Sequence, residues 1–274
     1  MRSFSFTGPL TAAVGILTFL ILNPNAPRAA SQSQETAANV VRRPVVVELF
    51  TSEGCSSCPP ADVLLQKLQA QQPIPAAQII PLEEHVDYWN HDGWTDPYSS
   101  AEWTERQQIY SALAKKDPYT PELVVDGQTQ LVGNSPKDAV LAIEDAANSA
   151  KTEILLTQTS AEAKAAHFSV SVGKVATLLA SDVAEVWLAV TEDGLHSAVS
   201  KGENAGHELT HTATLRALHK IGVADANGAP ASFSGETVVK FNSRWNVQNL
   251  HVTVFVQEKK SRQIVGAASV KIKV

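Results

Sequence analysis

The stretch VVVELFTSEGCSSCPPAD, residues 45–62, decides the expected fold of this chain. A mostly apolar run at 45–50 is typical of a buried strand, and a helix-like run follows it up to Gln69. Between them lie Cys55 and Cys58, the only two cysteines among 274 residues. A strand that passes into a helix through C-x-x-C is the pattern of a redox-active pair.

The expected position at a helix start explains why these cysteines would react. Unpaired N–H groups and the positive end of the helix dipole favour a thiolate at Cys55. A lowered thiol pKa makes that sulfur nucleophilic near neutral pH. We therefore predict that Cys55, as the more exposed sulfur, attacks the substrate. Cys58, one turn further on, would then attack the mixed disulfide and release the partner.

A structural disulfide and a metal site are the alternatives to redox chemistry for the cysteine pair. A structural disulfide across so short a loop adds little stability. A metal-binding C-x-x-C usually recruits two more ligands, and this chain has no second cysteine pair. Redox chemistry is favoured over both. The rival functions are a copper- or zinc-handling protein that uses Cys55, Cys58 and His85, and a non-catalytic binding protein.

The first 30 residues have the pattern of an export signal. Arg2 precedes an apolar run over 10–22, which is shorter than the roughly 20 residues of a membrane span. Small residues at 29–30 suit cleavage, and 31–43 is a polar lead-in that we expect to be disordered. We predict a periplasmic or secreted protein with no stable membrane span after cleavage; an uncleaved anchor is the alternative. A net charge of −6 disfavours nucleic acid as a partner.

The pattern of residues 44–150 predicts a first domain in which strands and helices alternate. Turn signals separate them, including Asp126-Gly127, which favours a tight hairpin. The expected strands are about 45–50, 78–86, 123–125 and 130–132, and the expected helices about 58–70, 99–114 and 135–150.

At Cys55-Ser56-Ser57-Cys58, Thr120-Pro121, Asp126-Gly127 and Gly133, this half resembles thioredoxin. The resemblance implies a cis Thr120–Pro121 bond, with Pro121 against the cysteine sulfurs and Thr120 beside the substrate groove. It also places Glu48 where thioredoxin keeps a buried acid, which implies that Glu48 relays a proton to or from Cys58.

A second resemblance matches the amino-acid sequence more closely and covers about residues 44–274. Residues 47–62, His85-Val86-Asp87-Tyr88-Trp89 and the run Gly202-Glu203-Asn204-Ala205-Gly206 are similar to an uncharacterised family of exported bacterial thioredoxin-like proteins. That family is catalogued as a domain of unknown function. It implies a fold and a location, but no substrate.

The segment 81–116 is an aromatic-rich insertion relative to a minimal thioredoxin. It holds six of the nine Trp and Tyr residues. They could form a wall that selects a partner, with Trp89 and Trp94 as substrate-binding residues, or they could pack an inserted helix onto the sheet. Five further side chains are of metal-ligand type, but capping and turn roles are favoured for the acids: His85, Asp87, His91, Asp92 and Asp96.

From residue 151 to 274 the apolar pattern changes to period two, with about seven strands. This predicts an all-β antiparallel sandwich, for which an immunoglobulin-like arrangement is one form. Its histidines at 207, 211 and 219 are expected on the surface. The expected fold class is thus an α/β thioredoxin-like domain followed by a separate sandwich that serves as a binding module.

These observations predict an exported thiol–disulfide oxidoreductase that acts on protein thiols or disulfides. Its predicted catalytic residues are Cys55, Cys58, Pro121 and Glu48, and its predicted substrate-binding residues are Thr120, Trp89 and Trp94. We expect no cofactor and no metal. With only two cysteines, the protein needs an external redox partner to restore its starting state.

Overall fold

The computed structural model describes residues 1, 3–5, 7–8, 41–91, 93–175, 182–225 and 232–274. The described residues from Val41 to Val274 belong to one compact unit. Most of the predicted export signal, most of the lead-in and Asp92 lie outside the described residues. No helix in the described parts of the chain is long and apolar enough to cross a membrane.

The described residues form thirteen strands, three α-helices and one short 3-10 helix. The helices are α1 (Pro59–Gln71), α2 (Ala101–Ala114), α3 (Pro136–Asn148) and η1 (Val247–Asn249). The strands of the first half are β1 (Arg43–Thr51), β2 (Ala77–His85), β3 (Glu122–Val125) and β4 (Thr129–Val132). The later strands are β5 (Ile154–Glu162), β6 (Ala165–Val172), β7 (Ala184–Glu192), β8 (Leu195–Ala198), β9 (Glu208–His211), β10 (Thr214–Ala224), β11 (Phe233–Lys240), β12 (Leu250–Glu258) and β13 (Ile264–Lys271).

The local structure around the cysteine motif agrees with the sequence-based prediction. β1 pairs in parallel with β2 after the crossover through α1, and it pairs antiparallel with β3 on its other side. Asp126 and Gly127 have φ angles of 47° and 67°, so the β3–β4 hairpin closes with both central residues in the left-handed region. That conformation suits an Asp-Gly pair because glycine adopts positive φ without strain.

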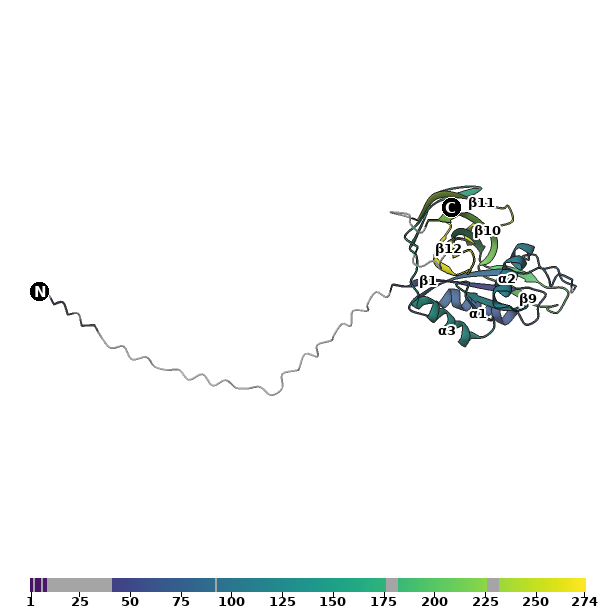
Figure 1. The fold of residues 1–274 in the computed structure, drawn as a ribbon, viewed down its shortest axis with the longest axis horizontal. Helices are drawn as coiled ribbons and strands as arrows, with labels where there is room; N and C mark the ends of the chain where they lie inside the picture. The colour runs from purple at the N-terminus through teal and green to yellow at the C-terminus, as the bar shows by residue number, and fades with distance from the viewer. Residues whose placement is uncertain (2, 6, 9–40, 92, 176–181, 226–231) are drawn as a thin grey trace, which may run out of the picture. The chain divides into compact units, whose positions relative to one another are not determined.

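The predicted fold class is wrong, because the two halves do not form separate domains. One mixed eight-stranded sheet runs in the order β13-β12-β7-β10-β2-β1-β3-β4. Figure 1 labels β1, β10 and β12 of this sheet. β10, from the second half, joins β2 at Thr214 opposite Glu83. Alternating apolar residues identify strands and their buried faces, but not the edge to which a strand is added.

A smaller sheet, β11-β6-β5, covers part of the large one. Its Phe168 and Val170 pack in one apolar cluster with Val186 of β7 and Val254 of β12. The two sheets therefore pack against each other through apolar side chains, but they do not form the separate sandwich that the period-two pattern predicted. The larger of the two packed sheets also contains β1, the strand that leads to the cysteine motif.

The helices lie on both faces of the β1–β2–β3 region. α1 and α3 bury Leu65 and Ile143 against Val47 and Leu49. On the other face, Trp103 of α2 packs in a cluster that includes Val46, Leu82 and, from the second half, Phe255. The two halves therefore share a core, and the cysteine motif lies in the connection between β1 and α1.

Candidate functional site

The two cysteines form a disulfide in the turn between β1 and α1. The Sγ atoms are 2.16 Å apart and the Cα atoms 5.4 Å apart. Cys55 and Cys58 are both fully buried. The prediction that Cys55 is the more exposed sulfur is therefore wrong, and the reason is a segment from the second half of the chain.

That segment, residues 199–207, connects β8 to β9; we call it the covering loop. Asn204 donates through Nδ2 to the backbone oxygens of Glu53 (2.8 Å) and Cys55 (3.0 Å). The backbone N–H of Ser56 donates to Glu203 Oε2 at 3.0 Å. Hydrogen bonds from the Ser56 side chain and from this N–H hold the pKa of the Glu203 carboxyl below its usual value. The sequence motif at 202–206 thus lies on the cysteine turn.

The start of α1 supplies fewer free N–H groups than the position of the cysteines predicted. Its first two residues are Pro59 and Pro60, which have no N–H to offer. The next N–H, of Ala61, donates to the backbone oxygen of Cys58 at 2.8 Å. A side-chain hydroxyl is available instead, because Ser57 Oγ lies 3.3 Å from Cys55 Sγ.

The Thr120–Pro121 bond is cis, as predicted. Trp89 links this turn to the cysteine turn, since its Nε1 donates to Thr120 Oγ1 at 2.8 Å. The Trp89 side chain also packs closely on Gly54, where an added β-carbon would lie 3.0 Å from Trp89 Cβ. Three of the predicted site residues, Cys55, Thr120 and Trp89, are thus brought into one neighbourhood.

Some aromatic rings of the insertion pack in the core, and others lie beside the cysteine turn. Trp103 and Tyr110 are buried in the core, as packing residues. Trp94 is half-buried and donates from Nε1 to Glu53 Oε2 at 2.8 Å. Trp89 and Trp94 therefore both flank the residues just before Cys55.

Glu48 lies on the face of β1 that α2 covers. Its two carboxylate oxygens accept from Arg106 Nε (2.6 Å) and from the Tyr110 hydroxyl (2.7 Å). α1, which follows Cys58, packs against the opposite face of β1. Both oxygens of Glu48 are thus engaged in a buried ion-pair network, and its role as a proton relay stays a prediction.

Asp62 is a buried acid in the first turn of α1, and the sequence pattern did not single it out as a site residue. Its N–H donates to the backbone oxygen of Cys58 at 3.2 Å. Its carboxylate accepts from Thr51 Oγ1 at 2.7 Å. Burial and the charge of Glu83 raise the pKa of Asp62 to about 7, against the opposing effect of His211. A group with this pKa can hold or release a proton near neutral pH.

Next to the cysteine turn lies a buried group that we call the histidine–carboxylate cluster: Glu53, Glu83, His85, Asp96 and His211. His85 Nδ1 is 2.7 Å from Asp96 Oδ2, and His211 Nε2 is 3.1 Å from Glu53 Oε1. His211 is 1% exposed, so its predicted surface position is wrong, whereas His207 and His219 are exposed as predicted.

Electrostatics within this cluster favour charged side chains. Burial lowers the pKa of both histidines, but the neighbouring carboxylates outweigh it. The pKa of His85 is therefore well above its usual value, mainly through Asp96, and that of His211 rises to about 9, mainly through Glu83. The histidines in turn outweigh the burial of Glu83 and lower its pKa to about 2.

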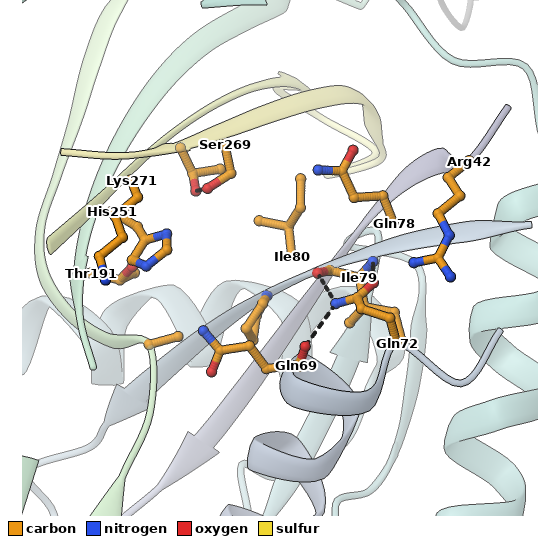
Figure 2. Close-up of a pocket in the computed structure, with 13 residues that line it drawn as sticks. Arg42, Gln69, Gln72, Gln78, Ile79, Ile80, Thr191, His251, Ser269 and Lys271 are labelled. Carbon is orange, nitrogen blue, oxygen red and sulfur yellow. Dashed lines mark hydrogen bonds between the residues drawn. The ribbon is translucent and has the colours of Figure 1, made fainter. Parts of the chain in front are cut away.

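A separate polar pocket of about 460 Å³ opens beside the end of α1. Figure 2 shows Gln69, Gln72, Ile80 and Ser269 among the side chains around it. None of the predicted catalytic or substrate-binding residues lines this pocket. The candidate redox site is thus the buried disulfide under the covering loop, and not this pocket.

A family model and two solved structures match most of this chain, and none of their descriptions states an activity. A family model described as a protein of unknown function (DUF1223) matches residues 46–257. A crystal structure of an Agrobacterium tumefaciens protein, determined by a structural genomics consortium, has a TM-score of 0.63 and 23% identity, covering 85% of this chain and 98% of that one. HBP35 of Porphyromonas gingivalis has a TM-score of 0.58 and 17% identity, covering 86% of this chain and 77% of that one. A search of curated proteins found no significant match.

Proposed function

This chain belongs to the DUF1223 family of proteins of unknown function, and we propose that it is an exported thiol–disulfide oxidoreductase acting on protein thiols or disulfides. The observation that carries the proposal is the disulfide between Cys55 and Cys58 in the turn from β1 to α1. A disulfide that closes so small a loop constrains the unfolded chain little, so stabilisation is a weak reason for it.

The proposed reaction exchanges two electrons between the pair and a substrate. A substrate thiolate attacks one sulfur of the disulfide, which forms a mixed disulfide and releases the other cysteine as a thiolate. A second substrate thiolate breaks the mixed disulfide. The substrate leaves oxidised, and Cys55 and Cys58 are left as a dithiol after taking up two protons. The reverse sequence reduces a substrate disulfide, and in either direction a second thiol–disulfide protein restores the pair.

Nearby side chains have roles in this proposal. Asp62 is the candidate to exchange a proton with Cys58, because it lies one turn further along α1 and has a pKa near neutrality. Trp89 and Trp94 flank the turn and supply apolar surface for a partner chain. The covering loop has to move before a protein substrate reaches either sulfur, since both are buried.

An exchange assay tests the proposal. The wild-type protein in a glutathione buffer should accelerate disulfide formation or reduction in a two-cysteine peptide at least roughly tenfold over the Cys55→Ser/Cys58→Ser double variant. Equilibration in the same buffers gives the reduction potential of the pair. A folded wild-type protein that is no faster than the double variant would show the pair to be structural.

The covering loop gives a second expectation. Asn204→Ala removes two hydrogen bonds to the cysteine turn, each worth about 0.5–1.5 kcal/mol, so the disulfide should react with dithiothreitol roughly 5- to 150-fold faster. The matched control is Asn148→Ala on the exposed end of α3. Reduction is followed by thiol alkylation and mass spectrometry. An unchanged rate in Asn204→Ala would mean that the loop does not limit access.

A further inference from the structure

The histidine–carboxylate cluster has a geometry that the redox reaction does not require. We propose that Glu83, His85 and His211 bind one divalent transition-metal ion, with zinc as the best fit. One imidazole nitrogen from each histidine and a carboxylate oxygen of Glu83 lie within 4.8 Å of one another, all buried. The site is assembled from the end of β2 and the end of β9, 126 positions apart in sequence (211 − 85).

The distances between the candidate ligand atoms suit a tetrahedral ion. His211 Nδ1 is 3.4 Å from Glu83 Oε1, and His85 Nε2 is 3.5 Å from Glu83 Oε2. With zinc–ligand bonds of about 2.0–2.1 Å, neighbouring ligands of a tetrahedral ion lie about 3.3 Å apart. The two nitrogens approach different oxygens of Glu83, and all candidate ligand atoms lie within 4.8 Å of one another, so a shift of the carboxylate and the rings by about an ångström would bring three of them to corners of the tetrahedron.

The outer contacts have the pattern that metal-binding histidines show. Each histidine uses its other ring nitrogen on a carboxylate, His85 on Asp96 and His211 on Glu53. Such contacts fix the ring orientation and leave the opposite nitrogen for the metal. Glu83 is held in the same way, since its Oε2 accepts from Thr214 Oγ1 at 2.8 Å.

A second observation is independent of the clustering. His85 Nε2 is fully buried and has no hydrogen-bond partner within the described residues. Its 3.5 Å approach to Glu83 is longer than a normal hydrogen bond, and buried polar atoms nearly always have a partner. Zinc would displace a proton from each ligating imidazole, so its two positive charges would replace those of the two histidines beside three carboxylates.

The types of ligand atom at the site favour zinc over calcium and magnesium. Calcium and magnesium prefer sets of oxygen ligands, whereas imidazole with one carboxylate suits zinc and its neighbours. The ring of Tyr98 packs edge-on against both histidines, with centroids 5.5 and 5.6 Å away, and closes one side of the site. The disulfide keeps Cys55 and Cys58 from acting as thiolate ligands, so this site is distinct from a metal-binding C-x-x-C.

Zinc titration of the oxidised, chelator-stripped full chain, in competition with a chromophoric chelator, tests the proposal. We expect one zinc ion per chain. His211→Gln and His85→Gln should each lower the affinity at least about 100-fold, and Asp96→Asn about 10- to 100-fold. His219→Gln, an exposed histidine on β10, is the matched control and should bind zinc as the wild type does. The Cys55→Ser/Cys58→Ser double variant should also bind normally.

Several results would overturn the site. They are a folded wild type without stoichiometric zinc, normal affinity in folded His211→Gln, or loss of binding in the double serine variant. If the histidine variants unfold, as judged by circular dichroism, the absorption spectrum of the cobalt-loaded wild-type protein provides the test instead. Tetrahedral d–d bands without a thiolate charge-transfer band support the site, and an octahedral spectrum excludes it.

Discussion

A Cys58→Ser variant is expected to accumulate mixed disulfides with its protein partners. In this variant the Cys55 thiolate still attacks a partner disulfide, but no second thiol is in place to release the partner. Acid quenching, alkylation and non-reducing electrophoresis of cells that express the variant would show these adducts. We expect at least about tenfold more adduct than with Cys55→Ser, because the intramolecular release step is the one removed.

The structure changes the reason for choosing Cys55 as the attacking sulfur. Exposure does not distinguish the cysteines, since both are buried. The covering loop does, because Asn204 and Glu203 contact the backbone of Cys55 and Ser56. Opening the loop would uncover the Cys55 side of the turn, while Cys58 stays at the N-terminal cap of α1.

The serine variants are matched controls for each other, because each removes one sulfur from the same turn. Equal adduct from both variants would mean that the two sulfurs are equally accessible once the loop moves. No adduct from either, in cells that contain oxidised partners, would contradict the redox function.

Features set by nearby residues were predictable from the sequence. The strand, turn and helix around the cysteine pair follow from a short apolar run, two cysteines and a helical run. The hairpin at Asp126-Gly127 follows from the positive φ angles that this pair accepts. Pro59 and Pro60 are visible in the same motif, but the prediction that N–H groups favour a Cys55 thiolate overlooked that proline has none.

Features that depend on long-range placement were not predictable. Glu53 and His211 are 158 positions apart and yet form a buried pair, because β10 adds to the free edge of β2 and the β8–β9 hairpin lies over the cysteine turn. A strand pattern fixes which side chains alternate, but not which sheet edge the strand joins. His211 therefore looked like a surface residue, and the motif at 202–206 had no assigned place.

Replacing Arg106 with methionine is expected to destabilise the protein by about 3–5 kcal/mol. Arg106 is buried on α2 and donates to Glu48, Gln257 and Tyr110. Its guanidinium also lies 3.6 Å from Glu84, a fully buried acid. Burial and the charge of Glu48 already raise the pKa of Glu84 well above its usual value. Methionine fills similar space but leaves Glu48 without its cation, and removing one partner of a buried pair leaves the other charge uncompensated.

Urea unfolding followed by circular dichroism measures this loss, with Arg244→Met, an exposed arginine, as the matched control. The deficit should be smaller at pH 5 than at pH 8. The charge of Arg106 lowers the pKa of the buried Glu84, so without Arg106 that pKa should lie further above its unfolded value, and protonation of Glu84 at low pH removes the buried charge. Adding Glu48→Met to Arg106→Met should recover part of the stability, because both buried charges are then absent. A deficit below about 1 kcal/mol, the size seen for exposed pairs, would show that water reaches this network and that β1 and α2 are not held together by it.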